Sequence, residues 1–304
     1  MVPVFYEIFS EKSPGNGLIY WSKGRCRNML GYIGAGKVSK SMALYQKSRG
    51  FEIGGFYSRS AASAQTAAAL TESKVYGSVS ELATSCSIIF IATPDDAISG
   101  VATALSDGMR NLSGKTVIHF SGALSSSSLD AARQKGAAVF SVHPPLPFSG
   151  VITDTGLLDS LTYTAEGQGD AGIIEKLFPN VRYILPEQKP LYHAAMCILS
   201  NYTVTLANAA QNILTEIGLE LSPFFPLLDN TLNNICVKGA EQALTGPIAR
   251  GDTGTVQKHL AALGPPELKH LYATLGRATA SDALKNHFID KATYLKLKEV
   301  LTCE

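Results

Sequence analysis

Short apolar segments alternate with helical patterns from residue 30 onward, and this alternation constrains the fold more than any other feature of the sequence. The clearest segment is Ile88–Ala92, an uninterrupted apolar run that suits a parallel strand buried on both faces. Strands separated by helices of about 10–15 residues are typical of βαβ units and of an open parallel sheet. The pattern therefore predicts an α/β fold in which helices cover a parallel sheet.

Residues 29–185 carry the strand signals, and residues 186–304 carry only helical ones. Thr93 is expected to cap a helix, with Pro94 in its first turn. We therefore predict an N-terminal domain with a Rossmann-type parallel sheet and an all-α C-terminal domain. The expected strands are residues 30–33, 52–57, 74–76, 87–92, 115–120, 137–142, 161–165 and 181–185; the other expected helices are residues 37–48, 61–70, 191–217, 224–244, 253–263, 267–284 and 291–301.

Residues 1–28 contain prolines, glycines and a basic patch, but no apolar core of the kind that a secretory signal needs. We expect them to form a poorly ordered extension. Because Met29 stands directly before the first strand, a start codon assigned too early would also explain this segment.

The composition excludes several classes of protein. The chain has 26 Lys and Arg against 25 Asp and Glu, and a net charge of +1 offers no positive field for nucleic acid. No apolar stretch approaches the roughly 18–20 residues of a membrane helix. The five cysteines are scattered without a C-x-x-C motif, which indicates free thiols in a reducing compartment such as the cytoplasm. No metal site is predicted, because no ligand motif such as H-E-x-x-H occurs.

A glycine-containing loop, Gly34-Ala35-Gly36-Lys37-Val38, joins the first strand to the first helix. The first glycine allows a tight turn, and the second lets the backbone approach a pyrophosphate that rests on the helix N-terminus. Ser39 occupies the third position of the motif, where Gly or Ala is usual, and is small enough to pack there. The motif predicts a dinucleotide-binding loop, and a tight turn without a ligand is the alternative.

The residues after the second strand indicate which dinucleotide binds. An NAD-binding chain carries Asp or Glu about 20 residues beyond the loop, whereas this chain reads Ser58-Arg59-Ser60. Because Arg pairs with a 2′-phosphate through several donors, we expect NADP(H), with NAD(H) less favoured. Alternatively, Arg59 is a solvated residue at the entry to a helix. Thr93 and Pro94 follow the fourth strand and are expected to border the cofactor.

Three histidines are candidates for proton transfer, because imidazole changes charge near neutral pH. His119 lies inside a predicted strand and is expected to be structural. His143 follows the next strand and suits either a structural or a functional role. His193 begins the long helix, where an ideal α-helix would place it on one face with Ser200 and would place Asn201 at the edge of that face. Such a face suggests the lining of a cleft, and polar groups satisfied inside a helical bundle are the alternative.

The segment Thr245–Asp252 interrupts two predicted helices with Gly and Pro. Arg250 in this segment is a candidate for binding a substrate carboxylate, with Thr245 close to it in sequence. A local ion pair between Arg250 and Asp252 is the alternative.

Several segments together resemble a bacterial family that pairs a Rossmann-like NAD(P)-binding domain with a domain of unknown function, DUF2520. The resemblance covers about residues 29–290 and implies the architecture of 6-phosphogluconate-dehydrogenase-like reductases, whose helical domain often forms a dimer. Relatives include ketopantoate reductases, pyrroline-5-carboxylate reductases and prephenate dehydrogenases. The matching pieces are Gly34–Gly36, Ala92–Ile98, His119–Ser125, His143–Pro145, Tyr192–Ala195, Ser200–Tyr202 and Ala243–Asp252.

The long helix departs from the pattern of the superfamily. Its hydroxyacid dehydrogenases use a Lys-x-x-x-Asn pair on this helix, whereas here His193 occupies the comparable region and Asn201 lies further along. The resemblance therefore does not imply their substrate class.

We predict an NADP(H)-dependent oxidoreductase that reduces a small anionic ketone, such as a ketopantoate-like 2-oxo acid, or an imine. His193 is the predicted proton donor, and Ser200 and Asn201 would orient the reacting carbonyl. A non-catalytic NADP(H) sensor and a prephenate-type dehydrogenase, suggested by His143-Pro144, are the alternatives. We expect a homodimer through the helical domain and no nucleic-acid or membrane partner. The predicted substrate-binding residues are Ser121, His143, Thr245 and Arg250.

Overall fold

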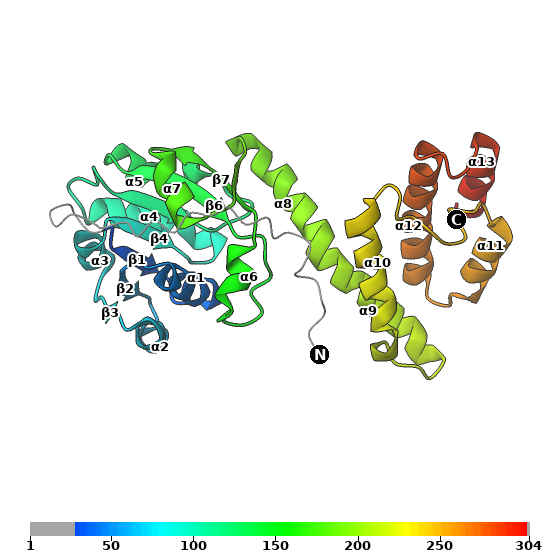
Figure 1. The fold of residues 1–304 in the computed structure, drawn as a ribbon, viewed down its shortest axis with the longest axis horizontal. Coiled ribbons are helices and arrows are strands. Elements are labelled where there is room, and N and C mark those ends of the chain that lie inside the picture. Colours follow the sequence, from blue (N-terminus) through cyan, green and yellow to red (C-terminus); the bar gives the residue numbers. More distant parts are fainter. Residues whose placement is uncertain (1–27, 303–304) are drawn as a thin grey trace, which may run out of the picture. The chain divides into compact units, whose positions relative to one another are not determined.

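The computed structural model describes residues 28–302, in which an eight-stranded sheet is followed by helices (Figure 1). The described residues divide into two compact units, with the boundary between Ala195 and Met196. The predicted N-terminal extension lies outside the described residues, apart from Asn28.

The sheet of the first unit has the strand order β3-β2-β1-β4-β5-β6-β7-β8. All neighbouring strands run parallel except β6 and β7, which pair antiparallel. The order reverses between β1 and β4, so the carboxyl ends of these two strands lie side by side, which is where open α/β sheets bind ligands. The strands are β1 (Leu30–Ile33), β2 (Ile53–Tyr57), β3 (Lys74–Val75), β4 (Ile88–Ile91), β5 (Thr116–His119), β6 (Ala138–His143), β7 (Tyr163–Gln168) and β8 (Val181–Tyr183).

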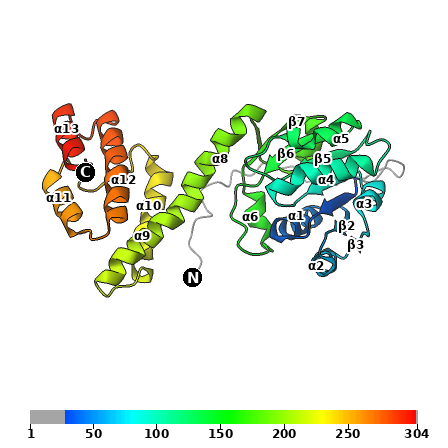
Figure 2. The ribbon, with the colours of Figure 1, turned by 180° about the vertical axis from the view of Figure 1, so that it is seen from behind.

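Helices cover both faces of the sheet (Figures 1 and 2). Because successive residues of a strand point to opposite faces, Phe90 of β4 packs in one core with Met42, while Ile89 packs in the other with Leu105. One core involves α1 (Lys37–Ser48), α2 (Ala61–Thr71), α6 (Thr155–Asp159) and α7 (Ala171–Leu177); the other involves α3 (Val79–Ser85), α4 (Asp95–Asp107) and α5 (Asp130–Gln134).

The rest of the chain is helical. In the second unit, α11, α12 and α13 share a small core that includes Ile248, Val256 and Leu297. No helix within residues 28–302 is long and apolar enough to cross a membrane. The helices are α8 (Lys189–Cys197), a π-helical segment (Ile198–Tyr202), α9 (Thr203–Glu216), α10 (Phe225–Lys238), α11 (Thr253–Ala262), α12 (Pro266–Lys285) and α13 (Lys291–Val300), with 3₁₀ turns at Ser126–Leu129, Pro186–Gln188 and Ser222–Phe224.

The predicted fold class is confirmed, with a mostly parallel sheet followed by a helical region. The sheet is not parallel throughout, because β7 and β8 run against the other strands. The expected helix over 224–244 ends at Lys238, since Gly239 adopts φ +79° and leaves the helical conformation. Helix α3 was not predicted at all.

Candidate active site

The loop between β1 and α1 has the form of a phosphate-binding turn. Gly34 adopts φ +102°, and a Cβ there would collide with the carbonyl oxygen of Ala92, so only glycine fits. Gly36 is the N-cap of α1, and no atom lies within 4 Å of where its Cβ would stand. The first turn of α1 has neither a side-chain cap nor an acidic residue. Its backbone N–H groups therefore form an electropositive helix end that suits a phosphate.

The other residues of the loop hold it in place. Ser39 is fully buried, and its hydroxyl donates to the carbonyl of the first glycine at 2.6 Å, which shows how serine substitutes for the usual third glycine. Lys37 donates to the Ser149 carbonyl, also at 2.6 Å. Ala35 and Val38 pack in the core, so only their backbone groups are oriented toward a ligand.

The segment after β2 contains Arg59, a cationic side chain that could bind a phosphate group. Arg59 is exposed and forms no hydrogen bond or ion pair with any residue in the range 28–302. Ser60 is the N-cap of α2 and accepts from the Ser63 N–H at 3.2 Å, while the Ser58 hydroxyl accepts from the Ser60 N–H at 3.3 Å. The two serines thus fix the turn that presents the guanidinium.

Thr93 does not cap α4, contrary to the prediction. The helix begins one residue later than expected, and Pro94 is its N-cap, without a side-chain hydrogen bond. The Thr93 hydroxyl is instead buried and has no partner among the described residues. Its backbone lies against the Gly34 turn. A buried hydroxyl without a partner beside a phosphate-binding turn fits a site for a bound ligand.

Two histidines meet at the carboxyl ends of β5 and β6. The rings of His143 and His193 lie 6.0 Å apart, nearly perpendicular. Both rings rest on Gly122, because a Cβ there would lie 2.5 Å from His193 Cδ2 and 2.9 Å from His143 Nε2. The other ring nitrogen of His143, Nδ1, forms a 2.9 Å hydrogen bond with the hydroxyl of Tyr192. Burial, followed by the charges of Lys189 and His193, lowers the pKa of His143 to about 3.

A buried lysine lies beside this pair. Lys189, the first residue of α8, is 1% exposed. Its ammonium donates to the Ser121 carbonyl at 2.8 Å and to the Ser141 hydroxyl at 2.5 Å. Burial lowers the pKa of Lys189 to about 8, and the carboxylates of Glu166 and Asp95 oppose this shift. The ammonium therefore ties the start of α8 to the sheet edge through oxygen atoms rather than through an ion pair.

Several hydrogen bonds order the loop after β5. His119 Nδ1 accepts from the Ser121 N–H at 3.2 Å, so its Nε2–H donates to the Ser125 carbonyl at 3.1 Å. Burial lowers the pKa of His119 to about 4. The Ser121 hydroxyl donates to the Asp95 carboxylate at 2.7 Å. His119 and Ser121 thus shape the loop on which the histidines rest, and the role of Ser121 in substrate binding stays a prediction.

Four of the predicted site residues, Ser200, Asn201, Thr245 and Arg250, belong to the second unit. The face predicted for His193 and Ser200 assumed an uninterrupted α-helix, whereas residues 198–202 are π-helical. Their roles in substrate binding or catalysis stay predictions.

The loop that carries Arg250 is built around a helix cap. Asp252 does not pair with Arg250; it caps α11, accepting from the Thr255 N–H at 2.9 Å and from the Thr255 hydroxyl at 2.6 Å. Ile248 packs into the core of the second unit and anchors the loop. Arg250 is exposed and has no hydrogen-bond or ion-pair partner within residues 28–302.

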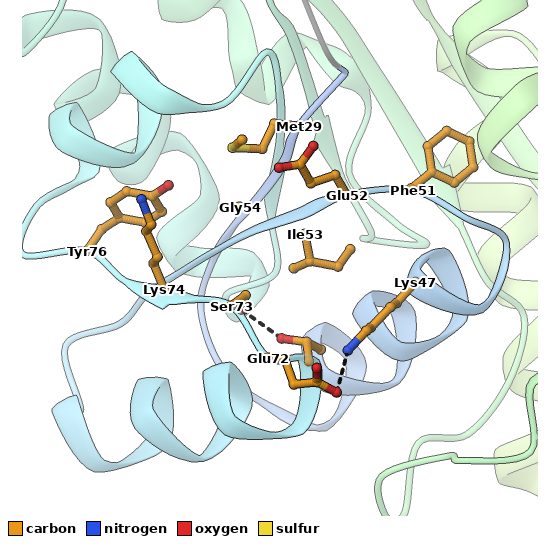
Figure 3. A pocket seen from close by; sticks show the side chains of 11 residues that line it. Met29, Lys47, Phe51, Glu52, Ile53, Gly54, Glu72, Ser73, Lys74 and Tyr76 are labelled. Atoms are coloured by element: carbon orange, nitrogen blue, oxygen red, sulfur yellow. Dashed lines mark hydrogen bonds and ion pairs between the residues drawn. The ribbon is translucent and has the colours of Figure 1, made fainter. Parts of the chain in front are cut away.

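A pocket of about 460 Å³ lies elsewhere, at the amino ends of β2 and β3 (Figure 3). Ile53 and Gly54 line it, and an ion pair of 3.0 Å joins Lys47 to Glu72 at its rim. This edge of the sheet is opposite the phosphate-binding turn, so the pocket is separate from the candidate site. Among the described residues, no group of three His, Cys, Asp or Glu side chains is placed to hold a metal ion.

Sequence reasoning missed Lys189 and the contact between Tyr192 and His143. The partners of Lys189, Ser121 and Ser141, lie 68 and 48 positions earlier in the chain, so no local pattern indicates that this lysine is buried. Tyr192 directly precedes His193, and a hydroxyl beside a candidate proton donor was a signal that could have been used.

The fold is that of an α/β protein with a mostly parallel sheet. Residues 21–144 match the Rossmann-like domain family, and residues 168–279 match the domain of unknown function DUF2520. The chain thus combines a Rossmann-like domain with a DUF2520 domain, and the resemblance stated from the sequence is confirmed.

Three solved structures of similar fold differ in how similar their sequences are to this chain. A Bacteroides fragilis protein with a proposed NADP oxidoreductase activity is 21% identical, with a TM-score of 0.70, over 84% of this chain and 98% of its own. A Thermotoga maritima protein is 26% identical, with a TM-score of 0.64, over 85% and 99%. A reductive aminase from Aspergillus terreus, in complex with NADPH and ethyl-5-oxohexanoate, is 14% identical, with a TM-score of 0.59, over 91% and 93%. The chain therefore has the fold of NADP-dependent reductases. Curated protein sequences give no significant match.

Proposed function

We propose that this protein is an NADPH-dependent reductase of a small anionic ketone, such as a 2-oxo acid, or of an imine. The observation that carries the proposal is that one sheet edge bears both a phosphate-binding turn and a pair of histidines. The turn follows β1, and the histidine pair rests on the loop after β5, two strands away. The first unit thus presents binding groups and proton-carrying groups along the same edge.

The residues present fit the cofactor. The N–H groups at Gly36 would hold the pyrophosphate, and the unpaired Thr93 hydroxyl would gain a partner. Arg59 would hold the 2′-phosphate, which no carboxylate at the end of β2 would repel. When bound, NADPH supplies a hydride to the carbonyl or imine carbon.

The histidines would handle the proton that the reduction requires. His193 is the proposed donor to the substrate oxygen or nitrogen, and His143 would hold the same atom through Nε2. Arg250 is the proposed partner of a substrate carboxylate, and Thr245, Ser200 and Asn201 are the further proposed contacts. The free thiols of Cys86 and Cys236 suit a reducing compartment such as the cytoplasm.

We also propose that a second copy of the chain covers the apolar faces of α9 and α10. Neither helix has a buried residue in the described chain. Leu227 is 69% exposed, Val237 65% and Val204 60%. Large exposed apolar side chains on adjoining helices are typical of subunit interfaces. Sedimentation of the full chain should show a dimer, and Leu227→Asp should shift it toward monomer. The exposed Leu295 of α13 provides the control Leu295→Asp, which should leave the dimer intact.

The proposed activity is tested with the full purified chain in two stages. Titration of NADPH fluorescence measures binding, and NADPH oxidation with a panel of 2-oxo acids and cyclic imines measures turnover. Binding with turnover supports the reductase. Binding without turnover across the panel favours a sensor of NADP(H). Absence of binding to either nicotinamide dinucleotide overturns both.

The turn itself offers a pair of glycine variants for the binding stage. Gly34→Ala should abolish NADPH binding, because its Cβ would collide with the Ala92 carbonyl. Gly100→Ala adds the same methyl group on α4, where nothing lies within 4 Å, and should bind NADPH normally. Equal binding by both variants would contradict the assignment of the turn.

A further inference from the structure

The hydrogen bond between Tyr192 and His143 constrains where the imidazole proton lies. A phenol is a stronger hydrogen-bond donor than a neutral imidazole N–H, and burial raises the pKa of Tyr192, so its hydroxyl keeps its proton. This difference in donor strength assigns the Tyr192 hydroxyl as the donor of the 2.9 Å hydrogen bond, so that Nδ1 is the acceptor and the single ring proton lies on Nε2. Nε2 points toward Gly122 and His193, and no residue in the described chain accepts its proton.

The charged groups around His143 disfavour a second ring proton. Lys189 is a buried ammonium on the same helix as Tyr192, and His193 is the neighbouring imidazole. The two nearby carboxylates have other partners: Asp95 accepts from the Ser121 hydroxyl, and Glu166 accepts from the Ser126 N–H at 2.6 Å and from its hydroxyl at 2.8 Å. Among the described residues, no carboxylate forms a hydrogen bond or ion pair with His143 that would stabilise an imidazolium there.

Lys189 also sets the position of Tyr192. Its two hydrogen bonds fix the first turn of α8 to Ser121 and Ser141. Tyr192 lies three residues further on and therefore stands nearly above Lys189 on the helix surface. The ammonium that holds the helix start thus also places the hydroxyl that contacts His143.

We propose that Lys189 and Tyr192 are positioning residues that keep His143 a neutral imidazole with its proton on Nε2, facing Gly122 and His193. In this state His143 is a hydrogen-bond donor at the sheet edge and can hold a carbonyl oxygen while His193 delivers the proton. The catalytic use of this N–H rests on the proposed reductase function; the protonation state of His143 does not.

The proposal is tested by NMR on the full chain labelled with ¹⁵N-histidine, with the His143 signals identified by their loss in His143→Gln. The wild type should show the Nε2–H tautomer at pH 7 and no protonation of His143 down to pH 5. Tyr192→Phe should convert this state into a mixture of tautomers. A wild-type Nδ1–H tautomer, or no change in Tyr192→Phe, overturns the proposal.

The chain contains a matched control for this tyrosine. Tyr272 bonds to His259 Nδ1 at 2.7 Å in the second unit, so Tyr272→Phe removes an equivalent hydrogen bond and should leave the His143 signals unchanged. A change of equal size in the two variants would indicate a general loss of structure and would overturn the specific role of Tyr192.

The variant Lys189→Met tests whether the positive charge of Lys189 keeps His143 from taking up a second proton. His143 should then take up a proton at measurably higher pH than in the wild type, and an unchanged titration overturns the role of Lys189. Lys115→Met is the control, because Lys115 is a partly buried lysine that donates to the Cys86 carbonyl at 3.0 Å away from the histidines. Should Lys189→Met fail to fold, the Tyr192→Phe result decides the tautomer by itself.

Kinetics separate this inference from the proposed function. Tyr192→Phe should lower kcat by about three- to tenfold, because the net free energy of one hydrogen bond corresponds to a rate change of this size. The Kd for NADPH should not change. An unchanged kcat with the tautomer shift present removes the catalytic use of the Nε2 proton. A wild-type chain without any turnover refutes the reductase but leaves the NMR result standing.

Discussion

Two histidine–tyrosine pairs, one in each unit, have nearly the same geometry and different surroundings. His143 and Tyr192 bond at 2.9 Å with ring centroids 5.6 Å apart, and His259 and Tyr272 bond at 2.7 Å with centroids 5.7 Å apart. The ring planes cross at 80° and 86°. The hydrogen bond alone therefore does not distinguish a candidate site from an ordinary helix contact.

The surroundings do distinguish the two pairs. His259 is exposed on α11, whereas His143 ends strand β6 and has Lys189 and His193 as neighbours. Burial and these neighbours shift the pKa of His143 far from that of a solvated histidine. The lowered pKa of His143 at the carboxyl edge of the sheet, rather than the hydrogen bond, is what makes the first pair part of the candidate site.

The largest expected difference between the two regions is in turnover. His193→Ala should lower kcat by about 10²- to 10⁴-fold, the usual contribution of a general acid, and should leave NADPH binding intact. His259→Ala removes an exposed imidazole from the second unit and should leave kcat within experimental error. Steady-state kinetics with the best substrate of the panel, together with NADPH titration, measures both effects. Normal turnover in His193→Ala would remove this residue from the proposed role.

The next expected difference is in stability against acid. His143 and His119 have pKa values of about 3 and about 4 in the folded chain, below the value near 6.5 of an unfolded chain. The unfolded state therefore binds protons more readily as the pH falls below 6.5. The stabilisation from keeping each ring neutral is complete above pH 6.5 and is lost as the pH falls toward 4 for His119 and toward 3 for His143. When the pH is lowered from 7 to 5, each of the two histidines should reduce the free energy of unfolding by about 2 kcal/mol.

Urea unfolding followed by circular dichroism at pH 7 and pH 5 measures this dependence. His143→Gln should reduce the loss of stability between the two pH values, because glutamine does not titrate. His259→Gln, on the exposed surface of α11, should retain the full loss. The prediction fails if the two variants show the same pH dependence.

The strands of the first unit were predictable because a buried strand appears in the sequence as a run of consecutive apolar residues, as in Ile88–Ile91. Helix α3 was missed because it has only seven residues and several polar ones, although Ser78 and Glu81 form a capping pair that indicates its start. The direction of β7 could not be predicted, since alternation of apolar residues does not encode whether a strand runs parallel or antiparallel to its neighbour.

The candidate site was only partly predictable for a related reason. The phosphate-binding turn is local, so Gly34 and Gly36 indicate it directly. The burial of Lys189 and the meeting of His143 with Tyr192 depend on contacts between residues about 50 to 70 positions apart. A sequence shows that such residues exist, but their distances follow from the packing of the whole sheet.

The smallest expected difference concerns two exposed arginines, one in each unit. Arg59→Ala should weaken NADPH binding by roughly fivefold, about 1 kcal/mol, because an exposed pair with phosphate is screened by water and salt. NADH binding should not change, since NADH lacks the 2′-phosphate. Arg250→Ala should leave the affinity for both dinucleotides unchanged and raise the KM of an anionic substrate. An equal loss of NADPH and NADH affinity in Arg59→Ala would mean that Arg59 supports the turn after β2 rather than the 2′-phosphate.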